Sequence, residues 1–166
     1  TAYAGADGVA EDPPGVVVEG SGDVASDLEL ALRETERDLL STQGKAPAVR
    51  LVDLILFEAL LRSASDVHIQ PVRGRTLVRY RLDGVLHTVR ELPLSVAAAV
   101  VSRIKIMARL DVAETRAPQD GRATVTIGGS GGGAQAGRRV DLRVSTLPST
   151  YGERIVIRLL DPARSA

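Results

Sequence analysis

Arginine side chains recur at regular spacing in two stretches near the carboxyl end of the sequence. In Arg139-Val-Asp-Leu-Arg-Val-Ser145 and Gly152-Glu-Arg-Ile-Val-Ile-Arg-Leu-Leu160, apolar residues alternate with arginines. This is the pattern of a strand with one apolar face and one face that carries guanidinium groups. Guanidinium groups bind phosphates and carboxylates through paired hydrogen bonds.

Three pairs of arginines are spaced so that a strand would place both members on one face. The pairs are Arg75 and Arg79, Arg139 and Arg143, and Arg154 and Arg158. Two interpretations fit this arrangement. The arginines are either solvated and paired with carboxylates such as Glu153 and Asp141, or they form a phosphate-facing surface that completes a nucleotide site on another domain.

No nucleophilic, hydrolytic or metal-binding constellation is visible in the sequence. His68 and His87 lie in separate strand-like runs without metal-ligand spacing. Asp120 and Asp141 could meet across a sheet, but turn and salt-bridge roles explain them equally well. The phosphate-loop motif is incomplete, because Gly44-Lys45 is followed by alanine and the Gly-rich stretch 128–137 precedes a strand. We therefore predict that this chain is not an enzyme by itself.

The charge distribution divides the 166 residues at about residue 45. Residues 1–45 carry ten acidic and three basic side chains, whereas residues 46–166 carry eleven acidic and eighteen basic ones. The chain has no cysteine, which excludes disulfides and thiolate metal sites. Because it begins at Thr1 without methionine, we expect it to be a piece of a longer protein. Nucleic-acid binding is disfavoured, since only Phe57 and three tyrosines could stack on bases.

The elements that would position these arginines can be read in chain order. An acidic linker should contain one helix at 23–42 with a narrow apolar stripe that must dock or fray. A strongly apolar helix should begin at Pro47 and run to Ser63, and a second one, capped by Ser95, should run to Leu110. Predicted strands cover 66–70, ended by Pro71, and 76–82 and 85–90, joined by an Asp83-Gly84 type I′ turn.

The run Arg116-Ala-Pro-Gln-Asp-Gly-Arg122 reads as a turn, after which Ala123, Val125 and Ile127 should face the core. The stretch 128–137 should form an expanded hairpin tip between two paired strands. The predicted fold is therefore α+β, with a mainly antiparallel sheet of about five or six strands and two packed helices.

Six motifs, in order, resemble the hexameric ATPases of type II secretion and type IV pilus assembly. They are Ala64-Ser-Asp-Val-His-Ile69, Val78-Arg-Tyr-Arg-Leu-Asp-Gly-Val-Leu-His87, Ser102-Arg-Ile-Lys-Ile-Met-Ala-Arg-Leu-Asp111, Glu114-Thr-Arg-Ala-Pro-Gln-Asp-Gly-Arg122, Val140-Asp-Leu-Arg-Val-Ser-Thr-Leu-Pro148 and Gly152-Glu-Arg-Ile-Val-Ile-Arg-Leu-Leu-Asp161. The resemblance is strongest to the type II secretion member.

This resemblance implies that residues 46–162 are the second N-terminal domain of such an ATPase, a PAS-like unit upstream of the motor domain. Residues 1–45 would be an interdomain linker, and 163–166 would begin the linker to the absent motor domain. The resemblance further implies that the domain packs on the motor domain of a neighbouring subunit in a hexamer. Arginines from it would contact the phosphates of ATP, which the motor domain binds with Mg²⁺.

The positions that match the phosphate-contacting arginines are Arg122 and Arg143, with Arg139, Arg154 and Arg158 as further candidates. The parent protein is expected in the cytoplasm, peripheral to the inner membrane through a platform protein that binds its upstream domain. Two alternatives stay open, namely a pilus assembly parent and a free-standing sensor domain for a cyclic dinucleotide.

Overall fold

The computed structural model describes residues 24–40, 46–127 and 138–160, which form three helices and a six-stranded sheet. The helices are α1 (Val24–Leu40), α2 (Ala46–Leu61) and α3 (Leu94–Met107). The strands are β1 (Asp66–Val72), β2 (Arg75–Leu82), β3 (Val85–Leu92), β4 (Gln119–Ile127), β5 (Arg138–Ser149) and β6 (Gly152–Leu160). The α+β prediction is confirmed, whereas the calls on residues 1–22, 128–137 and 163–166 lie outside the described residues.

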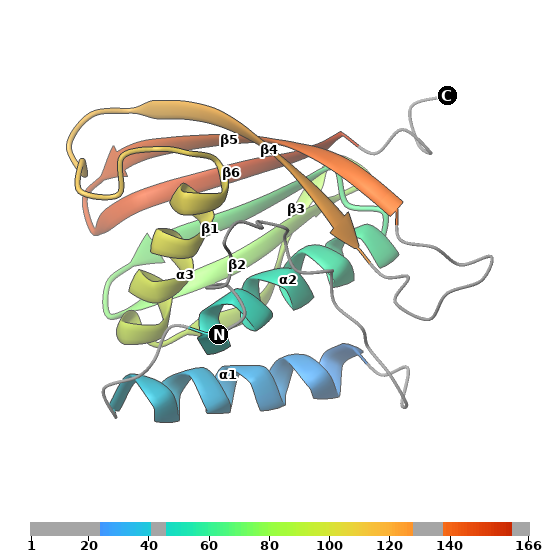
Figure 1. Ribbon diagram of the computed structural model, residues 1–166, viewed down its shortest axis with the longest axis horizontal. Coiled ribbons are helices and arrows are strands. Elements are labelled where there is room, and N and C mark those ends of the chain that lie inside the picture. The colour runs from blue at the N-terminus through green and yellow to red at the C-terminus, as the bar shows by residue number, and fades with distance from the viewer. Residues whose placement is uncertain (1–23, 41–45, 128–137, 161–166) are drawn as a thin grey trace, which may run out of the picture.

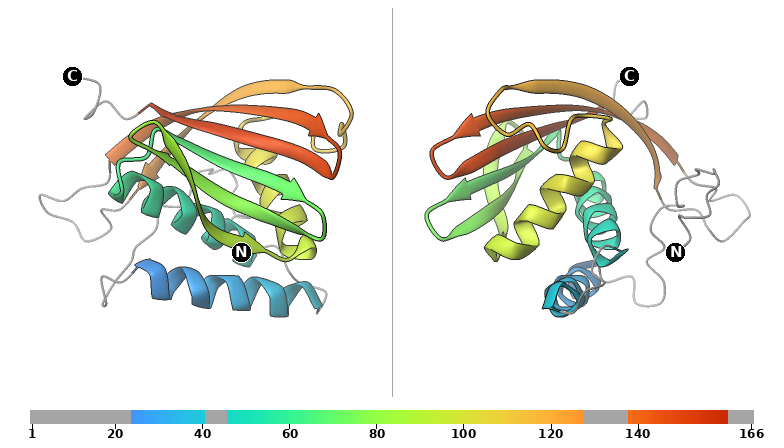
Figure 2. Two further views of the ribbon diagram at one scale, coloured as in Figure 1. Left: turned by 180° about the vertical axis from the view of Figure 1, so that it is seen from behind. Right: turned by 60° about the vertical axis from the view of Figure 1, so that its left-hand side comes forward.

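The sheet is antiparallel throughout, in the order β3-β2-β1-β6-β5-β4. Two three-stranded halves that are far apart in the sequence therefore meet where β1 pairs with β6. Figure 1 and Figure 2 show α2 and α3 beneath one face of the sheet and α1 outside them. The opposite face carries no helix among the described residues.

Alternation of apolar side chains explains which sheet face is covered. Val67, Ile69, Val78, Tyr80 and Ile157 are at most 1% exposed and point to the helices. Their strand neighbours carry most of the charged side chains and point the other way. We call the helix-free side the outer face.

Helix α2 is apolar around most of its circumference because it lies between two layers. Leu51, Leu54 and Leu56 are fully buried, and α1 packs on α2 from the side away from the sheet. Leu28 and Ala31 on the narrow stripe of α1 are also buried, so this stripe docks on the neighbouring helices. The burial of apolar area on both sides holds the three layers together.

A polar contact inside this core joins α2 to the β2–β3 hairpin. The hydroxyl of Tyr80 lies 2.8 Å from Oε1 of Glu58 and 3.0 Å from the carbonyl oxygen of Ile55. Arg90 Nη2 donates to both carboxylate oxygens of Glu58, at 3.0 and 3.1 Å. Burial raises the pKa of Tyr80, and the Glu58 carboxylate raises that pKa further, so the phenol remains a neutral donor.

Several predicted boundaries are corrected by the structure. Pro71 does not end the first strand but lies within β1. Because β1 pairs with β6 only over Asp66–Ile69, one edge of Pro71 has no ladder partner, and its missing N–H is tolerated there. Ser95 does not cap α3, which begins after Pro93 without a side-chain cap and ends at Met107. The turn at Asp83-Gly84 is as predicted, since both residues have positive φ.

Candidate anion-binding face of the sheet

Three arginines lie side by side across β4, β5 and β6 on the outer face. Arg122 is opposite Arg143, and Arg143 is opposite Arg158. Directly opposite side chains on antiparallel strands have Cβ atoms roughly 5 Å apart, and like charges in such positions repel each other. We refer to Arg122, Arg143 and Arg158 as the arginine row.

Among the residues that the structure describes, a carboxylate neutralises only the Arg158 end of this row. Asp66 of β1 is opposite Arg158, whose Nε donates to Oδ1 at 3.0 Å. Arg81 of β2 approaches Oδ2 at 3.3 Å, and the Ser65 hydroxyl donates to the same oxygen at 2.8 Å. Burial acts to raise the pKa of Asp66, but the hydrogen bonds from Ser65 and Arg158 and the charge of Arg158 lower it below its ordinary value.

Arg122 and Arg143 differ from Arg158 in having no such partner. Both side chains are exposed, and neither has an ion pair or hydrogen bond within residues 24–40, 46–127 and 138–160. Two carboxylates lie nearby but accept hydrogen bonds from other side chains. Asp120 accepts from Ser145 at 2.6 Å, and Asp141 accepts from Thr124 at 2.9 Å. The two aspartates that the sequence left as a candidate pair therefore do not meet.

The remaining predicted arginines lie on the same face but in different settings. Arg139 is exposed and lies opposite Thr126, at the start of β5. Arg154 is half-buried, and its Nη2 lies 3.3 Å from Nδ1 of His68. A hollow of about 200 Å³ lies beside Arg122, lined also by Ala123, Thr124, Asp141, Leu142 and Leu160.

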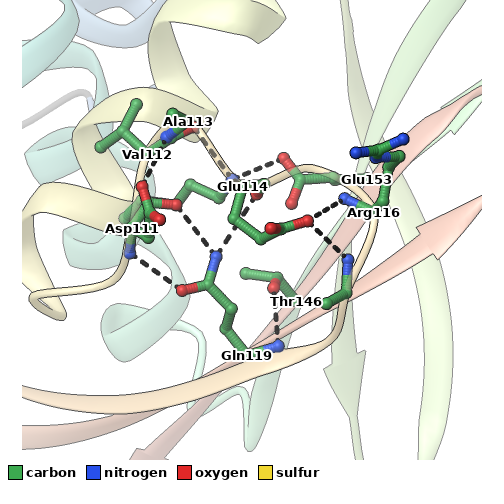
Figure 3. A network of polar contacts seen from close by, with 10 residues as sticks. Asp111, Val112, Ala113, Glu114, Arg116, Gln119, Thr146 and Glu153 are labelled. Atoms are coloured by element: carbon green, nitrogen blue, oxygen red, sulfur yellow. Dashed lines mark hydrogen bonds and ion pairs between the residues drawn. The ribbon is translucent and has the colours of Figure 1, made fainter.

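A polar network holds the loop that leads into β4 (Figure 3). It thereby fixes the position of Arg122 near the start of this strand. Lys105 of α3 is 1% exposed, and its Nζ donates to Oε1 of Glu153 at 2.7 Å and to the carbonyl of Glu114 at 2.8 Å. Gln119 Oε1 accepts from the amide of Asp111 at 2.9 Å, and its Nε2 donates to the carbonyl of the same residue at 3.0 Å. Glu114 Oε2 accepts from the amides of Arg116 and Ala117.

The sequence prediction for this region is corrected at one point. Asp120 and Gly121 do not form a turn but lie in β4, and the irregular loop ends before Gln119. Glycine is needed here because a Cβ at Gly121 would lie 2.5 Å from the carbonyl oxygen of Ala108 and 2.7 Å from Cδ2 of Leu110. Glycine permits this close backbone approach. In the sequence, Asp120-Gly121 indicates a turn because glycine after aspartate is common in turns.

The sequence reasoning also missed the roles of Lys105 and Asp66. A signal for Lys105 was available, since it is one of two lysines among 21 basic residues and lies on an apolar helix. No residue pattern indicated that Asp66 would pair with an arginine 92 residues away. In the described residues there is no cluster of three or more metal-ligating side chains and no helix long and apolar enough to cross a membrane.

The fold and this face together define an α+β domain whose sheet presents guanidinium groups that have no partner within the described part of the chain. Comparison with known families matches residues 41–166 to the type II/IV secretion system protein family. The chain belongs to this family, and its relatives include proteins named type II secretion system protein E and a type IV pilus assembly ATPase.

Individual relatives give the same result. The chain is 49% identical over 144 residues to type II secretion system protein E of Pseudomonas aeruginosa, which covers 84% of the chain and 27% of that protein. It is 50% identical over 124 residues to a putative type II secretion system protein E of Escherichia coli K12, covering 75% and 24%. It is 43% identical over 142 residues to the type IV pilus assembly ATPase PilB of Myxococcus xanthus, covering 84% and 24%. The chain thus spans about a quarter of the length of the curated relatives it matches.

Proposed function

We propose that this chain is the N-terminal domain, just upstream of the motor domain, of a type II secretion ATPase. In this proposal it packs on the motor domain in a hexameric ring and presents Arg122 and Arg143 to the phosphates of ATP. The domain would thereby couple ATP hydrolysis to protein secretion or pseudopilus assembly. The relatives named type II secretion system protein E support this choice of system.

One observation carries the proposal. Arg122 and Arg143 are opposite each other on the outer face and have no anionic partner in the described part of the chain. Two repelling cations placed together cost stability, and an anion with several oxygens would relieve that repulsion. Phosphate suits this arrangement because a guanidinium binds it through two parallel hydrogen bonds.

The residues present fit the phosphates of ATP but not its metal ion. Arg122 and Arg143 supply donors for phosphate oxygens, whereas the described residues offer no cluster of carboxylates or histidines for Mg²⁺. In the proposal the motor domain holds the nucleotide and Mg²⁺, and the chemistry takes place there. The role of this chain is to neutralise negative charge on the phosphates as they react, as arginine fingers do.

The proposed partners follow from this role. They are the motor domains of the same and neighbouring subunits, and an inner-membrane platform protein reached through an upstream domain. The parent would then be cytoplasmic and peripheral to the inner membrane. A type IV pilus assembly ATPase is the second candidate, which the 43% identity to PilB of Myxococcus xanthus supports.

The test is ATP turnover by the full-length protein that contains this chain, assembled as a hexamer. Arg122→Ala and Arg143→Ala are each expected to lower the turnover number by about 10³-fold or more, because an arginine finger contributes that much to phosphoryl transfer. Arg143→Lys should recover only part of the rate, since lysine keeps the charge but not the planar pair of donors.

A matched control comes from the same sheet face. Arg75 is exposed on β2 and forms an ion pair with Glu91 at 3.3 Å, so Arg75→Ala should leave turnover unchanged. Wild-type turnover in both Arg122→Ala and Arg143→Ala would disprove the arginine-finger role. Calorimetry with a cyclic dinucleotide on the 166-residue chain addresses the sensor alternative, for which the proposal predicts no heat of binding.

A further inference from the structure

A second group of nitrogen-bearing side chains lies on the outer face, centred on β1. His68 of β1 is opposite Arg79 of β2 and opposite Val156 of β6, which places Arg154 one pleat further along β6. Arg154 Nη2 lies 3.3 Å from Nδ1 of His68, and Arg79 Nη1 donates to Oε1 of Gln70 at 3.1 Å. We call His68, Arg79 and Arg154 the β1 cluster.

The β1 cluster is separate from the arginine row. Arg154 and Arg158 are four residues apart on β6, which corresponds to ~13 Å along a strand. Arg143 on β5 lies beside Arg158, and Arg122 on β4 lies beside Arg143, so both are further from β1 than Arg158 is. One phosphate group cannot contact Arg154 and Arg122 at the same time.

Two guanidinium nitrogens in the β1 cluster lack acceptors. Nε of Arg79 and Nε of Arg154 are buried and have no hydrogen-bond partner in the described residues. Asp66, two residues from His68 on the same face, cannot serve, because its oxygens already accept hydrogen bonds from Arg158 and Ser65 and pair with Arg81. Neither guanidinium group of the cluster is paired with a carboxylate in the described residues, so an anion from outside the chain would balance their charge.

The protonation state of His68 determines which ring nitrogen can donate to a ligand. Burial lowers the pKa of His68, and the positive charge of Arg154 lowers it further, with smaller effects of the same sign from Arg81 and Arg79 against the opposing charge of Asp66. The imidazole is therefore neutral near pH 7. Because the Arg154 guanidinium can only donate, Nδ1 of His68 must accept and the ring proton is on Nε2.

We propose that His68, Arg79 and Arg154 form a second oxyanion site, which takes a phosphoryl group. Two guanidinium groups and an imidazole N–H supply several donors and a net positive charge, which matches a phosphate dianion better than a single carboxylate. This inference does not depend on the proposed role of Arg122 and Arg143.

The site predicts a measurable change at His68. A bound dianion next to the ring favours the charged imidazolium, so phosphate should raise the apparent pKa of His68 by ~1 unit. The measurement is an NMR titration of the histidine ring signals of the 166-residue chain in sodium phosphate and in sodium chloride of equal ionic strength. The chain has only two histidines, and the exposed His87 on β3 serves as the internal reference.

Variants separate this site from the arginine row. Arg154→Gln should abolish the phosphate-induced shift at His68, and Arg79→Gln should reduce it, while Arg122→Gln should leave it intact. Arg79→Gln also keeps the test usable if Arg154→Gln does not fold, as judged from the amide spectrum. Adenosine monophosphate, titrated in parallel, shows the source of the phosphoryl group: a stronger response than to inorganic phosphate indicates a nucleotide, an equal one free phosphate, and both support the site.

Three outcomes would overturn the proposal. An equal shift in chloride would mean general screening by an adventitious ion only. An unchanged phosphate response in folded Arg154→Gln would show that the cluster does not bind the anion. Loss of the response in Arg122→Gln would place the anion at the arginine row, which contradicts the second site and leaves the proposed function standing.

Discussion

Nε of Arg158 lies 3.0 Å from Oδ1 of Asp66, although the two residues are 92 positions apart in the chain. This contact bridges β6 and β1, the pair of strands that joins the two halves of the sheet. It also distinguishes Arg158 from Arg122 and Arg143, whose charges no carboxylate balances in the described residues. Asp66 thus neutralises the Arg158 end of the arginine row, whereas the end formed by Arg143 and Arg122 is open to an anion.

Replacement of Asp66 by asparagine should destabilise the fold. The carboxylate is 3% exposed, accepts hydrogen bonds from Ser65 and Arg158 and forms an ion pair with Arg81, and a neutral amide would weaken these contacts. Because the side chain of Arg158 is 63% exposed, solvent screens much of that pair. We expect a loss of about 1–3 kcal/mol in the free energy of unfolding.

Urea denaturation of Asp66→Asn and wild type measures this loss. Asp141→Asn is the matched control, because Asp141 is an exposed carboxylate on the same face whose one acceptor contact in the described residues is with Thr124. It should change the free energy of unfolding by less than about 0.5 kcal/mol. Equal effects of the two substitutions would show that the Asp66 contacts add nothing to stability.

The pH dependence of stability should depend on His68. Its folded-state pKa is lowered from 6.5, so below that pH the unfolded chain binds the proton more readily than the folded one. The contribution is fully present above pH 6.5 and is lost as pH falls through the folded-state pKa. The free energy of unfolding should therefore decrease between about pH 7.5 and about pH 5.

The comparison of wild type with His68→Gln isolates this contribution. The variant should show a flatter dependence over the same pH range, while His87→Gln, altered at an exposed position, should follow wild type. Measurements in a buffer without phosphate keep this effect apart from anion binding. Parallel curves for wild type and His68→Gln would contradict the prediction.

The outer face could be predicted from the sequence because strand alternation is a local property. The spacing of Arg139 and Arg143, or of Arg154 and Arg158, depends only on two residues per pleat. Which strands lie side by side is a non-local property, so the position of β1 between β2 and β6 was not predictable from these patterns. The pairing of Arg158 with Asp66 follows from that order, as does the lack of a carboxylate partner for Arg122 and Arg143 among the described residues.

Burial of polar residues was equally hard to infer. Lys105 lies on an apolar helix, and only the folded structure brings Glu153 of β6 to within 2.7 Å of it. The role of Gly121 depends on a carbonyl oxygen thirteen positions earlier, at Ala108. In each case the sequence shows an unusual residue, but its contact partner comes from another element.

Replacement of Lys105 by methionine should be strongly destabilising. The ion pair with Glu153 has side chains 1% and 9% exposed, and Glu153 Oε2 already lacks a partner in the described residues. Methionine would leave a buried carboxylate unpaired, at an expected cost of about 3–5 kcal/mol. The thermal midpoint and urea unfolding of Lys105→Met test this.

A double variant distinguishes the effect of the unpaired charge from the effect of the changed side-chain shape at Lys105. Lys105→Met with Glu153→Gln removes both charges and should recover part of the stability lost in the single variant. Arg116→Gln is the control, because only the backbone amide of this exposed residue contacts the loop network. If the double variant is as unstable as the sum of the two single ones, the two residues do not interact.

Replacement of Gly121 by alanine should disturb the start of β4, where the arginine row begins. The added Cβ would lie 2.5 Å from the carbonyl oxygen of Ala108, a backbone atom held by the end of α3, so β4 or the loop must shift. Such overpacking typically costs about 1–3 kcal/mol. Urea unfolding gives the loss, and amide hydrogen exchange should show faster exchange at Arg122 and along β4 than in β2. Wild-type stability and exchange in Gly121→Ala would show that the close approach does not constrain this strand.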